Sequence, residues 1–285
     1  MAGLLLGLDI PAAGALDDPA GVAADAEALG FDFISNNDHV LGNDPRYEGW
    51  TLLAWLAAAT SRVRVVSRVL GVPYRNPALV AKMAESLDRL SGGRLVLGLG
   101  AGSGEAEYRA MGMPDASLAA RVTDLADTID ILRGLWTGEP LSHTGRAFSL
   151  DGAQIAPRAE HRIPIWLGAS GPRGLDLIGH TADGWIPSLR YVSPADAPAK
   201  IASIRRAAER ADRDADALDL IYNVEVAFDA NAAADMAGPP AKLADQLRGF
   251  LALGFSGFNF LVVGADRSAG VDRLAREIIP LLRQG

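Results

Sequence analysis

Short apolar runs alternate along this chain with segments whose apolar residues recur at helical spacing. Apolar runs bounded by turn residues and separated by helices are typical of a parallel sheet covered on both faces. The predicted strands are Gly3–Ile10, Phe31–Ser35, Val63–Val69, Leu95–Leu99, Pro164–Leu167, Gly184–Pro187, Leu218–Phe228 and Phe258–Val263. The predicted helices are Asp18–Leu29, Thr51–Ala59, Asn76–Leu90, Val122–Trp136, Pro172–His180, Pro194–Arg210, Pro239–Leu253 and Val271–Leu282.

The third of these helices has the clearest pattern. Asn76-Pro77 supplies a capping side chain and a proline at the first helical position, and Ser91-Gly92-Gly93 supplies a stop. Its apolar residues keep the helical period; they are Leu79, Val80, Met83, Ala84, Leu87 and Leu90. The segment therefore predicts an amphipathic helix with one buried face.

Eight strand-helix units in a chain of 285 residues predict an α/β fold of the closed (βα)8 class, the TIM barrel. A doubly wound open sheet is the alternative that the same pattern allows. One stretch, Thr137–Arg162, lacks a helical period and contains several glycines, so it predicts a short excursion between strands four and five, with a hairpin around Ser142–Leu150. We expect residues 1–285 to form a single domain.

The composition narrows the classes of function. The chain has 35 acidic and 27 basic residues, a formal net charge of -8, and this balance argues against a protein that binds nucleic acid through phosphate contacts. Because it has no cysteine, disulfides, thiolate catalysis and cysteine metal sites are excluded. No apolar run approaches the roughly 18 residues of a membrane span. We expect a cytoplasmic protein, which the absence of cysteine allows but does not prove.

Candidate catalytic groups follow the predicted strands, because barrel enzymes carry their active sites at the carboxyl ends of strands. Strand two is followed by Asp38 and His39, and histidine is the usual proton donor or acceptor near neutral pH. We interpret His39 as a catalytic candidate that Asp38 orients or assists; the alternative is that the pair only caps a loop. His143, His161 and His180 are interpreted as structural.

Two glycine-containing segments also lie at the carboxyl ends of strands. Gly98, Gly100 and Gly102 recur at a period of two, which leaves room for a flat ligand or for close packing of the barrel, and the sequence does not decide between them. Ser170-Gly171-Pro172 opens a helix whose free N–H groups could hold a phosphate or could simply form a cap. Rossmann, P-loop, HExxH and GxSxG motifs are absent, and no metal-ligand cluster is evident.

A longer set of motifs resembles a known family. Arg75–Lys82 continues through Leu87–Arg94 into Leu97–Gly102, and this block is similar to the luciferase-like monooxygenase family, in particular to its deazaflavin-dependent branch. Further blocks agree; they are Gly30-Phe31-Asp32, Leu132–Trp136, Thr144-Gly145-Arg146, Ile163–Ser170 and Ala182–Trp185. The resemblance covers nearly the whole chain. Its middle block is specific, and its last third is weak.

The resemblance implies a barrel that binds coenzyme F420 or FMN at its open end, with His39 near the ring carbon that exchanges hydride and Asp38 in the same site. It also implies a non-prolyl cis peptide, which we expect between Gly71 and Val72; the chemically easier alternative is Val72-Pro73. Glycine-rich loops would hold the ring and the phosphate. The implied cofactor-binding residues are Gly71, Val72, Gly100, Gly102, Ala169, Ser170 and Gly171.

The chain departs from the family where substrate should bind. An aromatic residue often follows the Gly-Ala-Gly block, but Ser103-Gly104 follows here, and Asn36-Asn37 is unusual. Either Glu105 or Glu107 could match a family glutamate that shuttles protons; we take Glu105 as the candidate and keep Glu107 as the alternative.

We therefore expect an oxidoreductase that transfers a hydride between coenzyme F420 and a small organic substrate. The alternatives are an FMN-dependent monooxygenase and a flavin-binding protein without catalysis. The expected partner is a small-molecule substrate, with no nucleic acid, no metal and no membrane span. A homodimer is compatible with the sequence, which does not decide it. The sequence does not name the substrate or the direction of hydride transfer.

Overall fold

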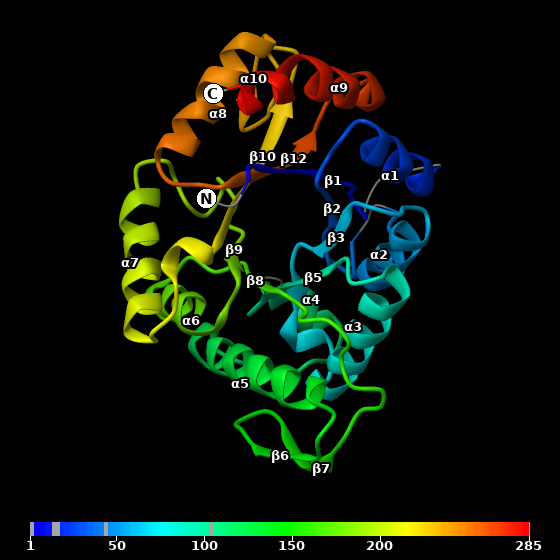
Figure 1. The fold of residues 1–285 in the computed structure, drawn as a ribbon, viewed down its shortest axis with the longest axis vertical. Helices are drawn as coiled ribbons and strands as arrows, with labels where there is room; N and C mark the ends of the chain where they lie inside the picture. Colours follow the sequence, from blue (N-terminus) through cyan, green and yellow to red (C-terminus); the bar gives the residue numbers. More distant parts are fainter. Residues whose placement is uncertain (1–2, 13–17, 43–44, 103–104, 285) are drawn as a thin grey trace.

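The structure is a computed structural model of the 285-residue chain, and it describes residues 3–12, 18–42, 45–102 and 105–284. Eight parallel strands close into a barrel within these residues, because β10 pairs with both β12 and β9 (Figure 1). In sequence order these strands are β1 (Leu5–Asp9), β2 (Phe33–Asn36), β3 (Arg64–Ser67), β5 (Leu95–Gly100), β8 (Ile165–Leu167), β9 (Gly184–Trp185), β10 (Asp219–Ala227) and β12 (Gly257–Val262). The predicted TIM barrel is confirmed, and the open sheet is not observed.

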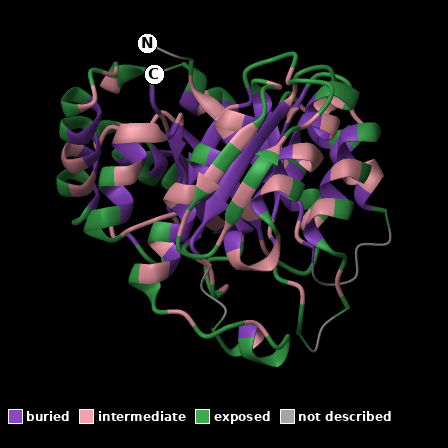
Figure 2. Ribbon diagram, turned by 90° about the horizontal axis from the view of Figure 1, so that it is seen from below, coloured by how far each residue is buried: buried purple, intermediate pink, exposed green. Residues whose placement is uncertain are grey.

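Helices surround the barrel, and their buried faces cover the outside of the strands (Figures 1 and 2). They are α1 (Pro19–Ala28), α2 (Gly49–Ala58), α3 (Pro77–Ser91), α4 (Glu105–Ala110), α5 (Leu118–Trp136), α6 (Pro172–Thr181), α7 (Ala197–Arg210), α8 (Pro240–Ala252), α9 (Arg267–Arg273), a π-helical turn (Leu274–Ile278) and α10 (Ile279–Arg283). Side chains cap several helices at the expected place: Asp18 accepts from Gly21 N–H, and Asn76 accepts from Ala78 N–H. None of the described helices is long and apolar enough to cross a membrane.

Short elements complete the fold. The strand β4 (Leu70–Gly71) pairs with β5, and β11 (Met236–Ala237) pairs with the end of β10. The single-turn helices are η1 (Val72–Tyr74) and η2 (Ala215–Ala217). The strands β6 (Leu141–Thr144) and β7 (Ser149–Ala153) form an antiparallel hairpin outside the barrel. The predicted excursion between the fourth and fifth barrel strands is therefore present.

The barrel interior has an apolar layer and a polar layer. The apolar layer contains Phe33, Val66, Val96, Trp166, Ile186 and Ile221, and it forms a cluster separate from the larger core between strands and helices. Polar residues replace apolar ones toward the carboxyl ends of the strands. Because alternate residues of a strand face the same side, Ser35 on β2 and Asn223 on β10 continue the interior rows of Phe33 and Ile221. Ser35 and Asn223 are both buried.

One helix was not predicted, and the predicted start of another is wrong. No helix was predicted where α4 lies, since six residues are too few to reveal a helical period. The helix α5 begins at Leu118 rather than Val122, because the Ser117 side chain caps it by accepting from Ala120 N–H. The other predicted strands and helices are found with ends shifted by a few residues, as is usual for helix and strand termini.

Candidate active site

His39 lies just beyond the carboxyl end of β2 and contacts a carboxylate from α4. Its Nδ1 atom is 3.2 Å from Oε2 of Glu107, and 52% of its side chain remains exposed. The contact joins two segments 68 residues apart in the sequence. One edge of the His39 ring is therefore held by Glu107. Much of the ring stays accessible at the carboxyl end of the barrel.

The Glu107 carboxylate is held by several donors. Oε1 accepts the N–H groups of Val40 at 2.5 Å and Leu41 at 2.6 Å, and the Tyr74 side chain also hydrogen bonds to Glu107. Burial raises the pKa of Glu107, but these bonds and the bond to His39 outweigh it, so the pKa lies below its usual value. Because an ionised carboxylate only accepts hydrogen bonds, Nδ1 of His39 carries the proton in this contact.

Glu105 occupies a different position. It forms an ion pair with Arg121 at 3.0 Å, and 64% of its side chain is exposed. Residues two positions apart on a helix differ by about 200° in direction, so Glu105 and Glu107 cannot face the same partner. Of the two glutamates considered from the sequence, the structure brings Glu107, and not Glu105, to His39. Ser103-Gly104, which comes directly before α4, lies outside the described residues.

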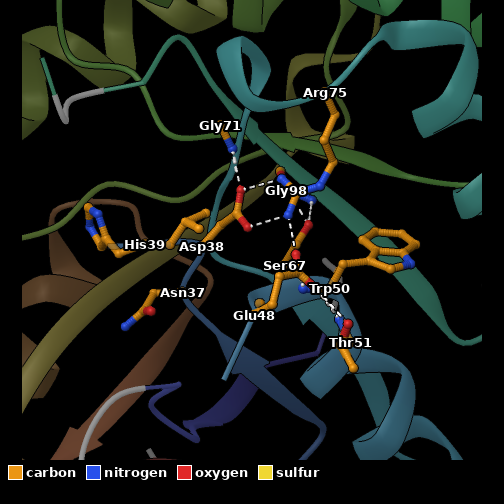
Figure 3. A network of polar contacts seen from close by, with 12 residues as sticks. Asn37, Asp38, His39, Glu48, Trp50, Thr51, Ser67, Gly71, Arg75 and Gly98 are labelled. Carbon is orange, nitrogen blue, oxygen red and sulfur yellow. Dashed lines mark hydrogen bonds and ion pairs between the residues drawn. The ribbon is translucent and has the colours of Figure 1, made fainter. Parts of the chain in front are cut away.

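Asp38 is buried and contacts neither His39 nor Glu107 in the hydrogen bonds described. Its carboxylate accepts the N–H of Gly71 at 2.9 Å and both ends of the Arg75 guanidinium at 2.7 and 2.8 Å (Figure 3). Arg75 also contacts Glu48, whose side chain caps α2. Burial raises the pKa of Asp38, while the hydrogen bonds and charge of Arg75 oppose that rise. Asp38 thus fixes the backbone next to His39.

A second polar network crosses the barrel interior and was not predicted. Asp9, at the end of β1, accepts from Arg68 at 2.7 and 3.1 Å and from the Ser35 hydroxyl at 3.0 Å. The chain of contacts continues through Asn259 to Asn223, whose side chains are 2.8 Å apart. The charges of Arg68 and Asp9 compensate each other in the interior, so the network forms a polar floor beneath the carboxyl ends of the strands.

The expected cis peptide lies elsewhere. The non-prolyl cis bond is between Arg68 and Val69, so the prediction for Gly71 and Val72 is wrong, and Val72-Pro73 is not cis either. The reason is local: Leu70–Gly71 pairs regularly with the end of β5, and Gly71 donates its N–H to Asp38, so the irregular backbone comes before this short strand. A second cis bond, Ala156-Pro157, lies in the excursion.

Close packing accounts for the glycines in and just after the fourth barrel strand, β5. A Cβ atom on Gly98 would lie 1.8 Å from the Ser67 carbonyl oxygen, and one on Gly100 would lie 2.7 Å from a Val69 methyl group. Gly102 has a φ of +82°, and a Cβ there would lie 1.9 Å from the Tyr108 hydroxyl. Packing against neighbouring protein atoms is therefore sufficient to explain these three positions, which the sequence left open.

The segment after β8 is tied down by two residues of later elements. The indole N–H of Trp185 donates to the Ala169 carbonyl at 2.7 Å, and the Lys200 ammonium donates to the Ser170 carbonyl at 2.8 Å. Gly171 precedes α6 and provides no side-chain cap. Lys200 was missed because nothing in its helix distinguishes it from a surface lysine. Its charge lies next to the amino end of α6, where the helix dipole also favours an anion.

These groups fit the ribityl phosphate and flat ring expected from the sequence. The amino end of α6 and Lys200 could hold a phosphate, and the partly exposed Val69 is an apolar surface beside Gly100 and Gly168. Asn37, which continues the interior row of β2, has a buried side-chain oxygen without a hydrogen-bond partner among the described residues. No group of histidine, aspartate or glutamate side chains that could hold a metal is found in the described part of the chain.

A surface cavity of about 380 Å³ lies at the opposite end of the barrel. Its charged lining residues are Arg64, Arg162, Asp183, Arg213, Asp214 and Asp219. Several of them pair with each other, such as Arg162 with Asp183. Because the amino ends of barrel strands serve stability rather than chemistry, the candidate site is the carboxyl end around His39.

Comparison with known proteins agrees with this architecture. The profile of a family described as luciferase-like monooxygenase matches residues 6–256. An F420-dependent glucose-6-phosphate dehydrogenase of Nakamurella multipartita is 31% identical over 217 residues, which are 74% of this chain and 63% of that protein. A 5,10-methylenetetrahydromethanopterin reductase of Methanolobus tindarius is 32% identical over 208 residues, 73% of this chain and 60% of that protein. The chain thus aligns with less than two thirds of either relative.

Among solved structures, an F420-dependent secondary alcohol dehydrogenase in complex with an F420-acetone adduct superimposes with a TM-score of 0.91. The match covers 99% of both chains at 20% sequence identity. At this identity the likeness supports the fold alone.

Proposed function

We propose that this chain, which belongs to the luciferase-like monooxygenase family, is an oxidoreductase that uses coenzyme F420 to move a hydride to or from a small organic substrate. The observation that carries the proposal is the His39–Glu107 pair at the carboxyl end of β2, where one imidazole edge is anchored and the ring remains half exposed. The name of the Nakamurella multipartita relative supports the choice of F420.

His39 is the proposed proton-handling group. Bound F420 would supply the hydride chemistry. When an alcohol is oxidised, its carbon loses a hydride and its hydroxyl group loses a proton; Nε2 of His39 is the free ring atom that accepts this proton, because Nδ1 holds its own proton toward Glu107. The anionic Glu107 then stabilises the imidazolium that forms. In the reverse direction His39 donates the same proton.

Other residues have supporting roles. Asp38 keeps the His39 backbone in place through Gly71 and Arg75. The segment Ala169–Gly171, with Lys200 behind it, is the proposed phosphate site. Gly100 and Gly102, with Val69 in place of Val72, are proposed to form the wall beside the ring. Glu105 pairs with Arg121 and is proposed to stabilise α4 rather than to move protons.

Side-by-side titration tests the cofactor. Purified protein is titrated with F420 and with FMN, and binding is followed by cofactor fluorescence; tighter binding of F420 supports the proposal. Turnover is then measured with a panel of small alcohols and sugar phosphates as F420 reductants. Tighter binding of FMN, with oxygen consumption, would instead support the FMN-dependent monooxygenase that the family description favours. Binding of either cofactor without any turnover would support the alternative of a flavin-binding protein without catalysis.

Self-association and location also remain proposals. Trp55 on α2 and Leu79 on α3 are 62% and 55% exposed, and these two helices contact each other. We propose that this face pairs with its copy in a twofold homodimer. Light scattering of the wild type and of Trp55→Glu distinguishes a dimer from a monomer. A cytoplasmic location and a single domain over residues 1–285 are likewise proposed.

A further inference from the structure

One short turn contacts both residues that hold His39. The turn is η1 (Val72–Tyr74) together with Arg75, and it connects the short strand β4 to α3. Tyr74 hydrogen bonds to Glu107, the partner of the His39 ring. Arg75 binds Asp38, the residue before His39. Two consecutive residues thus contact the partner of the His39 ring and the residue that precedes His39 in the chain.

Tyr74 is fixed as a hydrogen-bond donor to Glu107. Burial raises the pKa of the Tyr74 hydroxyl, and its bond to the Glu107 carboxylate raises the pKa further, so the hydroxyl keeps its proton. The Tyr74 ring packs edge-on against Tyr108, with ring centres 5.0 Å apart. Tyr108 lies next to Glu107 on α4, so the aromatic contact and the hydrogen bond hold the same helix against the turn.

Arg75 fixes the backbone on the other side. Its guanidinium makes two parallel bonds to Asp38, a planar arrangement that a lysine cannot reproduce. The same guanidinium contacts Glu48 at the start of α2 (Figure 3). The Arg75 side chain is only 12% exposed, so removing it would leave the Asp38 carboxylate buried without its cation. The His39 segment therefore depends on Arg75 for a defined position.

We infer that Tyr74 and Arg75 are positioning residues that hold the Glu107–His39 pair in the geometry for proton transfer. Neither side chain contacts His39 itself in the hydrogen bonds described; Tyr74 acts through Glu107 and Arg75 acts through Asp38. The inference rests on the proposed function for its catalytic meaning. Its structural content concerns the state of the His39 ring and is independent of any substrate.

The His39 ring carries a spectroscopic signature of this arrangement. Contact with the ionised Glu107 places the proton of the neutral ring on Nδ1 and leaves Nε2 free. Nitrogen NMR distinguishes this tautomer from the Nε2–H form. The chain has only four histidines, so His39 is assigned by the signal that disappears in His39→Asn. Spectra recorded at alkaline pH report the tautomer without cofactor or substrate.

The experiment compares Tyr74→Phe, Arg75→Lys and Arg75→Met with wild type. We expect the Nδ1–H form of His39 to predominate in the wild type and to lose population in all three variants, least in Arg75→Lys, which keeps the charge. The matched control is Tyr222→Phe, which removes another buried hydroxyl, one that donates to the Val192 carbonyl away from the site. It should leave the His39 signals unchanged.

Activity gives a second readout in the F420 assay. Misplacement of a catalytic group by about 1 Å costs on the order of 10²-fold, so we expect kcat to fall by roughly ten- to a hundredfold while KM changes much less. Folded Tyr74→Phe and Arg75→Lys proteins with wild-type His39 nitrogen shifts would overturn the inference. If the tautomer changes as expected but no form turns over with F420, the positioning role stands and the proposed function fails.

Discussion

Two histidine–carboxylate pairs lie at opposite ends of this barrel and look alike locally. At the carboxyl end, Nδ1 of His39 is 3.2 Å from Glu107, and at the amino end, Nδ1 of His161 is 3.0 Å from Asp88. The two histidine side chains are 52% and 44% exposed, and both carboxylates are largely buried. Distance and exposure alone would rank the two pairs equally as catalytic candidates.

Their surroundings differ. Asp88 belongs to α3 and also accepts the N–H of Leu95 at the start of β5, while the His161 ring covers Gly93. This pair ties a loop to the end of a helix. Glu107 instead binds the chain that leaves the carboxyl end of β2, and Tyr74 and the Asp38–Arg75 pair support that segment. A position at the carboxyl end of the barrel, rather than the pair itself, therefore marks the catalytic candidate.

Substituting each histidine in turn tests whether only the pair at the carboxyl end takes part in turnover. His39→Asn should preserve the fold and most of the cofactor affinity but lower turnover with F420 by roughly 10²-fold or more, because a positioned acid–base contributes about 10²–10⁴-fold. Steady-state kinetics and circular dichroism measure the two quantities.

His161→Asn is the matched control for that substitution. A partly exposed pair contributes little, so we expect the free energy of unfolding to fall by at most about 1 kcal/mol and turnover to stay unchanged. Loss of activity in His161→Asn with activity retained in His39→Asn would contradict the assignment of His39 as catalytic and His161 as structural. Failure of His39→Asn to fold would contradict it as well.

The barrel and the position of its site follow from residues that act locally. The helical spacing from Leu79 to Leu90 identifies α3 because the period continues over several turns. His39 was predicted as a candidate because strand order alone places it at the carboxyl end of the barrel. The resemblance to the family added the cofactor, which no spacing in the chain shows.

The remaining parts of the site depend on contacts between distant segments. The choice between Glu105 and Glu107 depends on α4 being a helix and on which face of it contacts the segment after β2. The contacts join residues 66 to 68 positions apart in the sequence. Tyr74 and Lys200 carry no local signal of their partners. The position of the cis bond depends on how β4 pairs with β5, which is a matter of register rather than composition.

A smaller effect is expected at the proposed phosphate site. Gly171 has a φ of -85°, and a Cβ there would meet nothing within 4 Å, so larger residues fit without strain. Gly171→Glu places a negative charge at the amino end of α6 and should weaken F420 binding by roughly tenfold, about 1.4 kcal/mol. Gly171→Gln has the same shape without the charge and should bind nearly as the wild type does. Equal F420 affinities of the two variants would show that the phosphate binds elsewhere.

Each end of the barrel also has a glutamate carboxylate that accepts backbone N–H groups: Glu107 at the carboxyl end and Glu27 at the amino end. At the carboxyl end, Glu107 accepts the backbone N–H groups of Val40 and Leu41. At the amino end, Glu27 of α1 accepts the backbone N–H groups of Ser61, Arg62 and Val63, the residues that lead into β3. Burial raises the pKa of Glu27, but these hydrogen bonds overcome it and lower the pKa to about 2.

The effect of Glu27 should appear in stability and not in turnover. A shift from 4.5 to about 2 would in full correspond to about 3 kcal/mol, but solvent screens this surface carboxylate, so we expect Glu27→Gln to lower the free energy of unfolding by about 1 kcal/mol. Since the folded-state pKa is the lower one, the contribution is present above pH 4.5 and is lost as the pH falls toward 2. Urea unfolding of both proteins from neutral to acidic pH should show curves that converge. A gap between them that persists at acidic pH, or a loss of turnover at neutral pH, would show that Glu27 does not act as a structural anion.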